Sequence, residues 1–380
     1  MSSLLPILPL PVEPDALSPA AREAEQEKNR MRRYFEKTEE QLGPTVEHEP
    51  VCLYLETTNR CNLLCTTCPR TYEQLEPEAD MSWELFTSLI NQYSGGQYPN
   101  IARVVLHGIG EPMLVKDLAA RVAYLKARNI YVLFNTNGTL LTEANGRALI
   151  EAGLDELRVS LDAAEAGMYQ AVRGKDFFAK IVTNVGKFTK MQREMGAPRP
   201  RVSLWLTGLR ETVGQLPDFV RLAHSVGVYE VYLQRLVFFD SPASDQSLAR
   251  AESALFEHTT AAEDELIAEA ARVAGQLGVM FSASGAVDPG ESIKKQRDDA
   301  PWSLCRRPWS LMYITANGRV LPCCIAPFSM KGYSSFTLGD ATRQTLREIW
   351  NGAEYQRFRE GLLTSAPPPA CVNCGLRWSL

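Results

Sequence analysis

The chain has 380 residues, of which 45% are hydrophobic and 22% are charged, and its net charge is −5. This composition is that of a soluble globular protein, and the length allows one large core plus a smaller appended one. The acidic balance argues against a nucleic-acid-binding surface, and no apolar run approaches the roughly 18 residues that a membrane-spanning helix needs. The leucine-rich start is broken by prolines and has no basic region, so we expect no signal peptide and a cytoplasmic location.

Residues 1–50 are predicted to be an extended segment followed by a helix, which begins at Ser18-Pro19 and stops at Gly43-Pro44. Apolar strand-like segments then alternate with helix-like segments. This alternation predicts a parallel sheet covered by helices, with too few strands for a complete eight-stranded barrel. The six expected strands lie at residues 51–59, 101–110, 131–138, 156–162, 201–209 and 228–237.

The pattern loosens from Asp240, where a loop is expected. A helix over 263–278, a last strand over 279–285 and an interdomain linker over 288–301 follow. The segment 311–324 predicts a β-hairpin, because two apolar runs flank the turn sequence Asn317-Gly318. We therefore expect an N-terminal extension over residues 1–50, a barrel domain over 51–285, and a linker with a small cysteine-rich domain over 286–380.

The nine cysteines fall into two groups that are far apart in the sequence. In a reducing compartment, clustered cysteines more often bind metal than form disulfides, so we interpret the groups as two metal sites. Cys52, on the first strand, is expected in the core. The first group comprises Cys61, Cys65 and Cys68, and the second comprises Cys305, Cys323, Cys324, Cys371 and Cys374.

The first group follows a strand and has the spacing CxxxCxxC, which resembles the signature of the radical S-adenosylmethionine (radical SAM) superfamily. That resemblance implies a [4Fe–4S] cluster held by three thiolates, whose fourth iron binds SAM. The reduced cluster then cleaves SAM to methionine and a 5′-deoxyadenosyl radical. From the residues alone, a zinc knuckle with a fourth ligand elsewhere is the alternative. Thr67 departs from the family, in which the residue before the third cysteine is often aromatic.

The resemblance also implies SAM-binding residues at the ends of successive strands. In the segment HGIGEP, glycines permit close backbone approach and Glu111 offers a carboxylate to the SAM ammonium. Ser160 and Asp162 are candidates for the ribose or the amino group, and Arg173 for the SAM carboxylate. A helix cap for Asp162, a salt bridge for Arg173 and turn formation for Asn137 are the structural alternatives. The candidates are Gly108, Gly110, Glu111, Asn137, Ser160, Asp162 and Arg173, with Asn135 on the same strand as Asn137.

The second group resembles the opening of the SPASM module, in its shortened "twitch" form. This implies one auxiliary [4Fe–4S] cluster, because the chain ends before further ligands could follow. The family's spacing from Gly318 selects Cys323 over its neighbour as a ligand. Cys324 is then either a packed small side chain or a catalytic hydrogen-atom donor. A four-cysteine zinc ribbon is the alternative site. The expected ligands are Cys305, Cys323, Cys371 and Cys374.

The expected fold is a partial (β/α)6 TIM-like barrel with a small C-terminal domain of a β-hairpin and helices. The expected enzyme uses SAM and two [4Fe–4S] clusters, takes its electron from a flavodoxin- or ferredoxin-type donor, and binds neither nucleic acid nor membrane. It oxidises a small polar molecule, such as a sugar, aminocyclitol or nucleoside-like compound, with the auxiliary cluster as electron acceptor. Redox-neutral decarboxylation or epimerisation, peptide modification and a non-catalytic scaffold are the alternatives. We expect peptide modification less than the other enzymatic alternatives, because residues 1–50 are too few to form a leader-binding domain.

Overall fold

The computed structural model describes residues 42–72, 75–93, 101–236, 251–255, 259–284, 288–294, 300–329, 336–372 and 374. The predicted N-terminal helix and the loop predicted from Asp240 lie outside these residues.

All strands belong to one sheet, in the order β10-β9-β8-β1-β2-β3-β4-β5-β6-β7. Strands β1 to β7 pair in parallel, each with the next along the chain. The expected α/β partial barrel is confirmed, and the strand expected after residue 278 extends its far edge as β7. The bounds are β1 Cys52–Leu55, β2 Arg103–Val105, β3 Tyr131–Thr136, β4 Glu156–Ser160, β5 Arg201–Gly208, β6 Glu230–Arg235, β7 Met280–Ala283, β8 Leu311–Ile314, β9 Arg319–Leu321 and β10 Gly339–Asp340.

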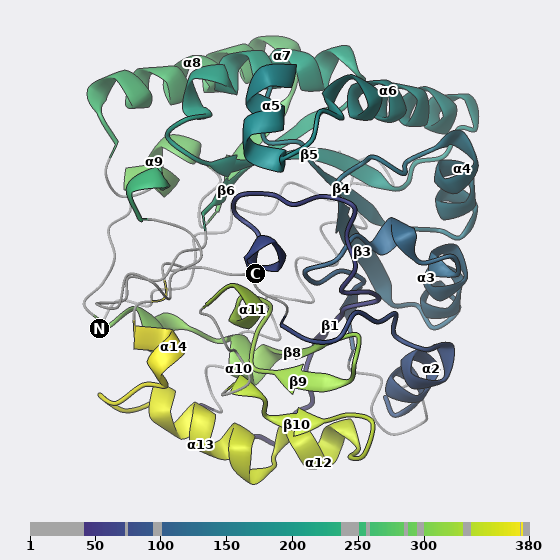
Figure 1. The fold of residues 1–380 in the computed structure, drawn as a ribbon, viewed down its shortest axis with the longest axis vertical. Coiled ribbons are helices and arrows are strands. Elements are labelled where there is room, and N and C mark those ends of the chain that lie inside the picture. Colours follow the sequence, from purple (N-terminus) through teal and green to yellow (C-terminus); the bar gives the residue numbers. More distant parts are fainter. Residues whose placement is uncertain are drawn as a thin grey trace, which may run out of the picture.

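Helices form an arc outside the curved sheet (Figure 1). They are α2 Trp83–Asn91, α3 Leu118–Lys126, α4 Glu143–Glu151, α5 Ala166–Arg173, α6 Phe178–Glu194, α7 Leu216–Ser225 and α8 Ala261–Leu277. Helix α8 begins at Thr260, which forms a capping box with Glu263. Within the predicted linker, Pro289–Lys294 form helix α9. Among the described residues, no helix is long and apolar enough to cross a membrane.

The two faces of the sheet differ in burial. Residues such as Phe134, Val159 and Leu204 are fully buried, and they face the covering helices. The residues between them, such as Asn135, Arg158 and Trp205, are only partly buried and face the inside of the arc. Because side chains alternate along a strand, the inner face carries these polar, partly exposed residues. It also carries a second, buried apolar cluster that includes Cys52 and Leu133.

The C-terminal hairpin continues the barrel sheet. Strand β8 pairs in parallel with β1, from Cys52 opposite Leu311 to Leu55 opposite Ile314, and β9 and β10 follow antiparallel. The other C-terminal elements, α10 Arg307–Ser310, α11 Ala326–Ser329, α12 Leu346–Trp350, α13 Ala353–Leu362 and α14 Pro369–Val372, surround this hairpin (Figure 1). The first edge of the barrel is therefore covered by the cysteine-rich part of the chain.

One carboxylate joins this hairpin to the barrel. Glu56, which follows β1, is buried and accepts hydrogen bonds from three segments. The Tyr313 hydroxyl donates at 2.6 Å, the Ala316 N–H at 3.1 Å and the Ile109 N–H at 2.9 Å. Burial raises the pKa of Glu56 to about 6, and these three donors oppose the rise.

We expect the Tyr313→Phe substitution to destabilise the protein more at high pH than at low pH. Because the folded-state pKa of Glu56 is raised, its protonated form favours folding, and this contribution is lost as the pH rises through about 6. The Tyr313 hydroxyl offsets part of that loss by donating to the ionised form. Removing it should cost about 1.5–3 kcal/mol of unfolding free energy at pH 8 and less at pH 5, measured from urea unfolding midpoints.

Tyr124→Phe is the matched control. The Tyr124 hydroxyl donates to Asn91 at 2.7 Å at an exposed position, so its removal should cost less and show no dependence on pH. An equal loss at both pH values for Tyr313→Phe would contradict the role given to Glu56.

Candidate active site

The first three cysteines lie on the loop between β1 and α2. The Cys68 N–H donates to the Cys65 carbonyl at 3.1 Å, and the Thr71 hydroxyl donates to the same carbonyl at 2.7 Å. Burial raises the pKa of Cys68 to about 12, and the neighbouring Cys65 and Cys61 thiols add to the rise. The three thiols therefore form one donor set rather than three isolated side chains.

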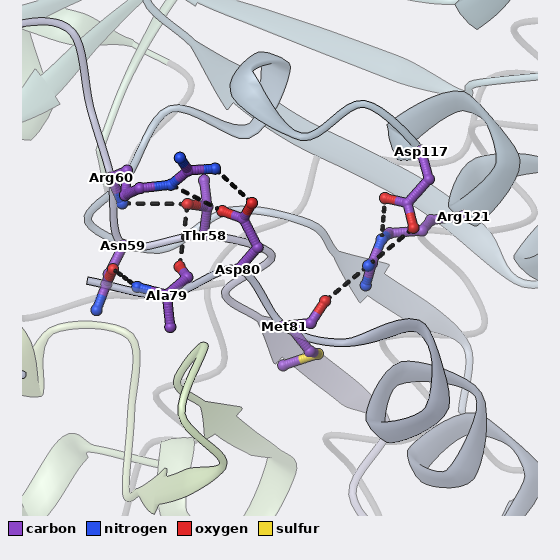
Figure 2. Close-up of polar contacts among 8 residues, drawn as sticks. All are labelled: Thr58, Asn59, Arg60, Ala79, Asp80, Met81, Asp117 and Arg121. Carbon is purple, nitrogen blue, oxygen red and sulfur yellow. Dashed lines mark hydrogen bonds and ion pairs between the residues drawn. The ribbon is translucent and has the colours of Figure 1, made fainter. Parts of the chain in front are cut away.

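A strap, defined here as residues 77–81, holds the residues that precede Cys61 (Figure 2). Thr58 and Asp80 form an antiparallel bridge, and the Asn59 Oδ1 accepts the Ala79 N–H at 2.8 Å. The Arg60 Nε donates to Asp80 at 3.0 Å. Because this loop has no regular structure of its own, these contacts fix the direction in which the chain enters the cysteine segment.

Arg121 fixes the end of the strap in turn. Its Nη2 donates to the Met81 carbonyl at 2.7 Å, and its Nε donates to Asp117 at 2.8 Å (Figure 2). The guanidinium also lies over the ring of Phe86, 4.9 Å from its centroid. The strap is thereby attached to helices α2 and α3.

The C-terminal end of α5 supports the other side of the cysteine loop. The Thr66 N–H donates to the Val172 carbonyl at 3.0 Å. Gly174 ends the helix in the left-handed conformation with φ +78°, and a Cβ at this position would lie 2.6 Å from the Leu64 carbonyl oxygen. Glycine is needed there both for the backbone angle and for the close approach of the loop.

A buried ion pair connects α5 to the ends of β4 and β5. Arg173 and Asp162 lie 2.5 Å apart, and Arg173 also contacts the Cys65 sulfur at 3.6 Å. Asp162 has the unusual φ of +61° and accepts the Thr207 N–H at 2.7 Å. The Arg173 Nε is buried and has no hydrogen-bond partner in the described part of the chain. A guanidinium thus lies beside the thiol group with donor capacity left over.

The segment HGIGEP crosses the same end of the sheet. Glu111 is buried, and its two oxygens accept hydrogen bonds from Met113, Thr136 and Asn137 at 2.7–3.0 Å. A Cβ at Gly110 would clash with the Thr58 carbonyl and lie 2.7 Å from that of Arg60. The Glu111 carboxylate therefore holds the ends of β2 and β3 together directly beside the cysteine loop.

Asparagines connect β3 to the first cysteine. The Asn137 Nδ2 donates to Asn62 at 2.8 Å and lies 3.9 Å from the Cys61 sulfur. The Asn135 N–H donates to the Nδ1 of His107 at 3.0 Å, while the Asn135 Oδ1 is buried without a partner among the described residues. Like the Arg173 Nε, this oxygen is an unsatisfied buried atom, and it lies near the carboxyl end of β3.

The second group of cysteines surrounds a buried arginine. Burial alone would lower the pKa of Arg307, and the thiols of Cys324, Cys323, Cys305 and Cys374 raise it above its usual value. Burial raises the pKa of Cys371 well above the usual value, and Cys305, Cys323 and Cys374 add to that rise. The four predicted ligands are therefore neighbours in space, with a guanidinium that offsets their charge.

Two adjacent cysteines of the second group lie close to β1. Cys323 packs against the buried cluster around Cys52. Burial raises the pKa of Tyr54, and the thiols of Cys324 and Cys52 add to this rise. The Tyr54 ring stacks on that of Tyr313, with ring centroids 6.3 Å apart.

Comparison with known families assigns a family to each of the two regions that carry the cysteines. Residues 55–223 match the model of the radical SAM superfamily, and residues 305–375 match that of SPASM, an iron–sulfur cluster-binding domain. The chain belongs to the radical SAM superfamily. It carries a SPASM domain at its C-terminal end, as the residues themselves predict.

Related proteins act on different molecules. The chain is 24% identical to a tungsten-containing aldehyde ferredoxin oxidoreductase cofactor-modifying protein of Pyrococcus furiosus, over 86% of this chain and 87% of that one. It is 27% identical to the PqqA peptide cyclase of Gluconobacter oxydans, over 87% and 84% of the two chains. The crystal structure of Streptococcus suis SuiB bound to the precursor peptide SuiA has the same fold, with a TM-score of 0.61 and 14% identity over 91% of this chain and 73% of that one.

The residues fit the groups that this superfamily binds. Three thiols on one loop leave one iron of a [4Fe–4S] cluster for SAM, and four further thiols suit a fully ligated cluster. Among the described residues, no three His, Cys, Asp or Glu side chains lie close enough to hold a single metal ion. The unsatisfied Arg173 Nε, on the side chain that contacts Cys65, is a donor that a polar cofactor beside the first cluster would meet.

Of the predicted SAM-binding residues, Asn137 and Arg173 contact the first cysteine group and Gly110 packs against the residues before it. Others are engaged elsewhere or with one another. Asp162 pairs with Arg173 in a buried salt bridge. A salt bridge was the alternative for Arg173 alone, whereas the alternative for Asp162 was a helix cap. Ser160 lies opposite Trp205 in the sheet, facing the interior. Gly108 packs against Glu56 and Tyr313. The binding of SAM by Gly108, Gly110, Glu111, Asn137, Ser160, Asp162 and Arg173 stays a prediction.

Sequence reasoning missed three residues that line the site. Glu56 comes directly after a buried strand, where a carboxylate is a recognisable signal in a parallel sheet. Asn62 lies between the cysteines and bonds to Asn137. Arg158 is a charged residue in the middle of an otherwise apolar strand, which is the signal that could have drawn attention to it.

Gly110→Ala should disrupt the site. The new methyl group would meet backbone carbonyls that cannot turn aside, so we expect a loss of about 3 kcal/mol in unfolding free energy, the upper end of the range for overpacking. Urea unfolding and the iron content after anaerobic reconstitution measure both effects.

Gly167→Ala is the matched control, because nothing lies within 4 Å of the methyl group it would add. On α5, this change should be neutral or stabilising by up to about 1 kcal/mol. Unchanged stability and iron content in Gly110→Ala would show that the segment HGIGEP is not packed as described.

Proposed function

We propose that this protein is a radical SAM enzyme that modifies a peptide. The observation that carries the proposal is the match to the PqqA peptide cyclase, which extends over 87% of this chain and includes both cysteine-bearing regions. A second relative, the mycofactocin maturase MftC of Mycolicibacterium smegmatis, is 31% identical over 47% of this chain and 43% of its own length.

This proposal replaces the leading expectation from the sequence, which was oxidation of a small polar metabolite. The argument against a peptide substrate rested on the short N-terminal segment. Residues 1–41 lie outside the described residues, so the structure does not bear on that argument, and the match to the peptide cyclase covers 84% of that protein. The relatives favour the peptide alternative. The proposal covers both oxidative and redox-neutral modification of the peptide.

The proposed cofactors are SAM and two [4Fe–4S] clusters. Cys61, Cys65 and Cys68 would hold the first cluster, and Cys305, Cys323, Cys371 and Cys374 would hold the second. When bound, SAM and its cluster supply a 5′-deoxyadenosyl radical that removes a hydrogen atom from a substrate carbon. Electrons would come from a flavodoxin- or ferredoxin-type donor.

The chain's own residues prepare this site in three ways. The strap and the end of α5 hold the cysteine loop at the carboxyl end of the strands. The buried Arg173 guanidinium beside Cys65 stabilises negative charge on the thiolates. Arg307 does the same for the second group, and Cys324 is a candidate hydrogen-atom donor to a substrate in the interior.

Iron analysis tests the cofactor assignment. Anaerobically reconstituted protein should contain about eight irons per chain, and the triple alanine variant of Cys61, Cys65 and Cys68 about four. Cys323→Ala should lose iron from the second cluster, whereas Cys324→Ala should keep about eight. About twelve irons in the unmodified protein would mean a third cluster, and tightly bound zinc with only about four irons would favour the zinc alternative.

A direct assay tests the peptide proposal. The reconstituted protein, with SAM, dithionite and short peptides encoded beside its gene, should change the mass of one peptide and form 5′-deoxyadenosine. Deuterium placed on the modified carbon should appear in 5′-deoxyadenosine, because hydrogen abstraction is the first step.

The triple cysteine variant serves as the control and should form neither product. Conversion of a sugar or aminocyclitol, with no peptide altered, would restore the oxidation of small polar molecules as the better assignment.

A further inference from the structure

The tip of the C-terminal hairpin contacts the strap that leads to the first cysteine group. Asn317, in the turn between β8 and β9, donates through its Nδ2 to the Glu76 carboxylate at 2.9 Å and to the Pro77 carbonyl at 3.0 Å. Arg319, the first residue of β9, forms an ion pair with the other oxygen of Glu76 at 3.3 Å. Only 3% of the Glu76 side chain is exposed, and a carboxylate so far removed from water needs partners of this kind.

One carbonyl connects this tip to the residues that precede the cysteines. The Pro77 carbonyl also accepts the Asn59 Nδ2 at 2.8 Å, and Asn59 lies two residues before Cys61. The Asn59 N–H donates to the Ala79 carbonyl at 3.2 Å, and its Oδ1 accepts the Ala79 N–H at 2.8 Å. The hairpin tip and the approach to Cys61 therefore meet at a single oxygen atom of the strap.

The same hairpin leads to the second cysteine group. Strand β9 runs from the tip to Leu321, and Cys323, a proposed ligand of the second cluster, follows two residues later. The turn is closely packed, because a Cβ at Gly318 would lie 2.5 Å from Thr342 and 3.6 Å from Leu85 of α2. A cluster that fixes the position of Cys323 therefore also restricts the strand that carries the tip.

We propose that Asn317 and Arg319 are positioning residues for the first cluster. They hold the strap, so that a cluster bound by the C-terminal domain also stabilises the cluster on the first cysteine group. The proposal rests on the two clusters of the proposed function and does not depend on the peptide. Apart from one bridge, the strap has no regular secondary structure. If it is released at the hairpin tip, the segment before Cys61 opens more often, and a cluster held by three thiolates is then lost more easily.

Two substitutions at Asn317 separate this role from turn formation. Asn317 is not among the described non-glycine residues with positive φ, so alanine fits its backbone. Asn317→Asp keeps the size of the side chain, and Asp-Gly is as typical of a hairpin turn as Asn-Gly. Aspartate would, however, turn a carboxylate toward Glu76 and the Pro77 carbonyl. A residue needed only for the turn would tolerate aspartate, whereas a residue that holds the strap would not.

Release of iron to a chelator measures the effect on each cluster. The anaerobically reconstituted protein should lose iron in two phases of about four irons each. The triple alanine variant of Cys61, Cys65 and Cys68 should keep only the phase of the second cluster, which identifies both phases. In Asn317→Ala and Asn317→Asp, the phase of the first cluster should become about tenfold faster, as expected for one lost hydrogen bond to a charged group. The phase of the second cluster should keep its rate.

A double-variant cycle tests the connection between the two clusters. Cys371→Ala removes a ligand of the second cluster outside the hairpin, and it should speed the release of iron from the first cluster. The same change in an Asn317→Ala background should add little, because the contact through which the second cluster acts is already lost. Effects that add in full would mean that Asn317 and the second cluster act independently, and would overturn the connection.

Asn145→Ala is the matched control. The Asn145 Nδ2 donates to the Leu140 carbonyl at 2.9 Å at an exposed position on α4, so its loss should change neither phase. If the Asn317 variants do not fold, Arg319→Gln removes only the ion pair with Glu76, from a side chain that is 48% exposed. This variant should speed the phase of the first cluster alone.

The outcomes separate this proposal from the proposed function. Iron release in Asn317→Asp that matches the unmodified protein would overturn the positioning role, and so would equal acceleration of both phases. An unmodified protein with only about four irons would overturn both the positioning role and the cofactor assignment. Selective loss of the first cluster in the Asn317 variants of an enzyme that alters no peptide would leave the positioning role standing and remove the peptide.

Discussion

The structure depends on what surrounds the buried carboxylate of Glu56. A carboxylate removed from water is costly unless donors replace its hydration, and here the three donors come from the turn of the glycine segment, from β8 and from the hairpin that follows it. Two of these donors, Tyr313 and Ala316, lie close together in the sequence, and the third, Ile109, lies about two hundred positions before them. The radical SAM domain and the SPASM domain therefore meet at Glu56, and its carboxylate accepts hydrogen bonds from both. The parallel pairing of β1 with β8 continues the same junction through the backbone.

The cysteine loop shows how a metal-binding segment without regular structure acquires a defined position. Its entrance is held by the strap of residues 77–81, its far side by the end of α5, and its inner side by Asn137 and Arg173. These contacts come from the strap, from α5 and from the end of β3. Ordering the loop costs conformational entropy, and contacts with elements that are already rigid offset this cost. The thiol ligands are therefore held in position before a cluster binds.

Much of this arrangement could be predicted from the sequence. The strands were recognisable because their outer faces are continuously apolar, and the cysteines because their spacing is specific. The position of Asp162 at a strand end was also evident, although its pairing with Arg173 was not, because the two residues meet only after α5 folds back onto the sheet. The continuity of the sheet from β1 to β8 was missed for a similar reason. A hairpin pattern reveals two strands but not the third strand beside which they pack.

The substrate was the least accessible part. Residues that line the barrel interior, such as Arg158 and Trp205, come singly from different strands, so no local motif collects them. Their significance follows from the register of the sheet, which places a guanidinium on an indole. The available signal was a charged residue within a largely buried strand. Its meaning depends on which face of the strand is exposed in the barrel interior, and the sequence does not show this.

The pairing of β1 with β8 also has a consequence for how the protein is made. Tyr313 and Glu56 are 257 positions apart. During synthesis, the outer edge of β1 therefore stays unpaired until almost the whole chain has emerged. An unpaired edge on a nascent sheet is a template for association with other chains. The time needed to synthesise the chain as far as β8, rather than the folding of the barrel, thus sets the interval in which this protein is most exposed to aggregation.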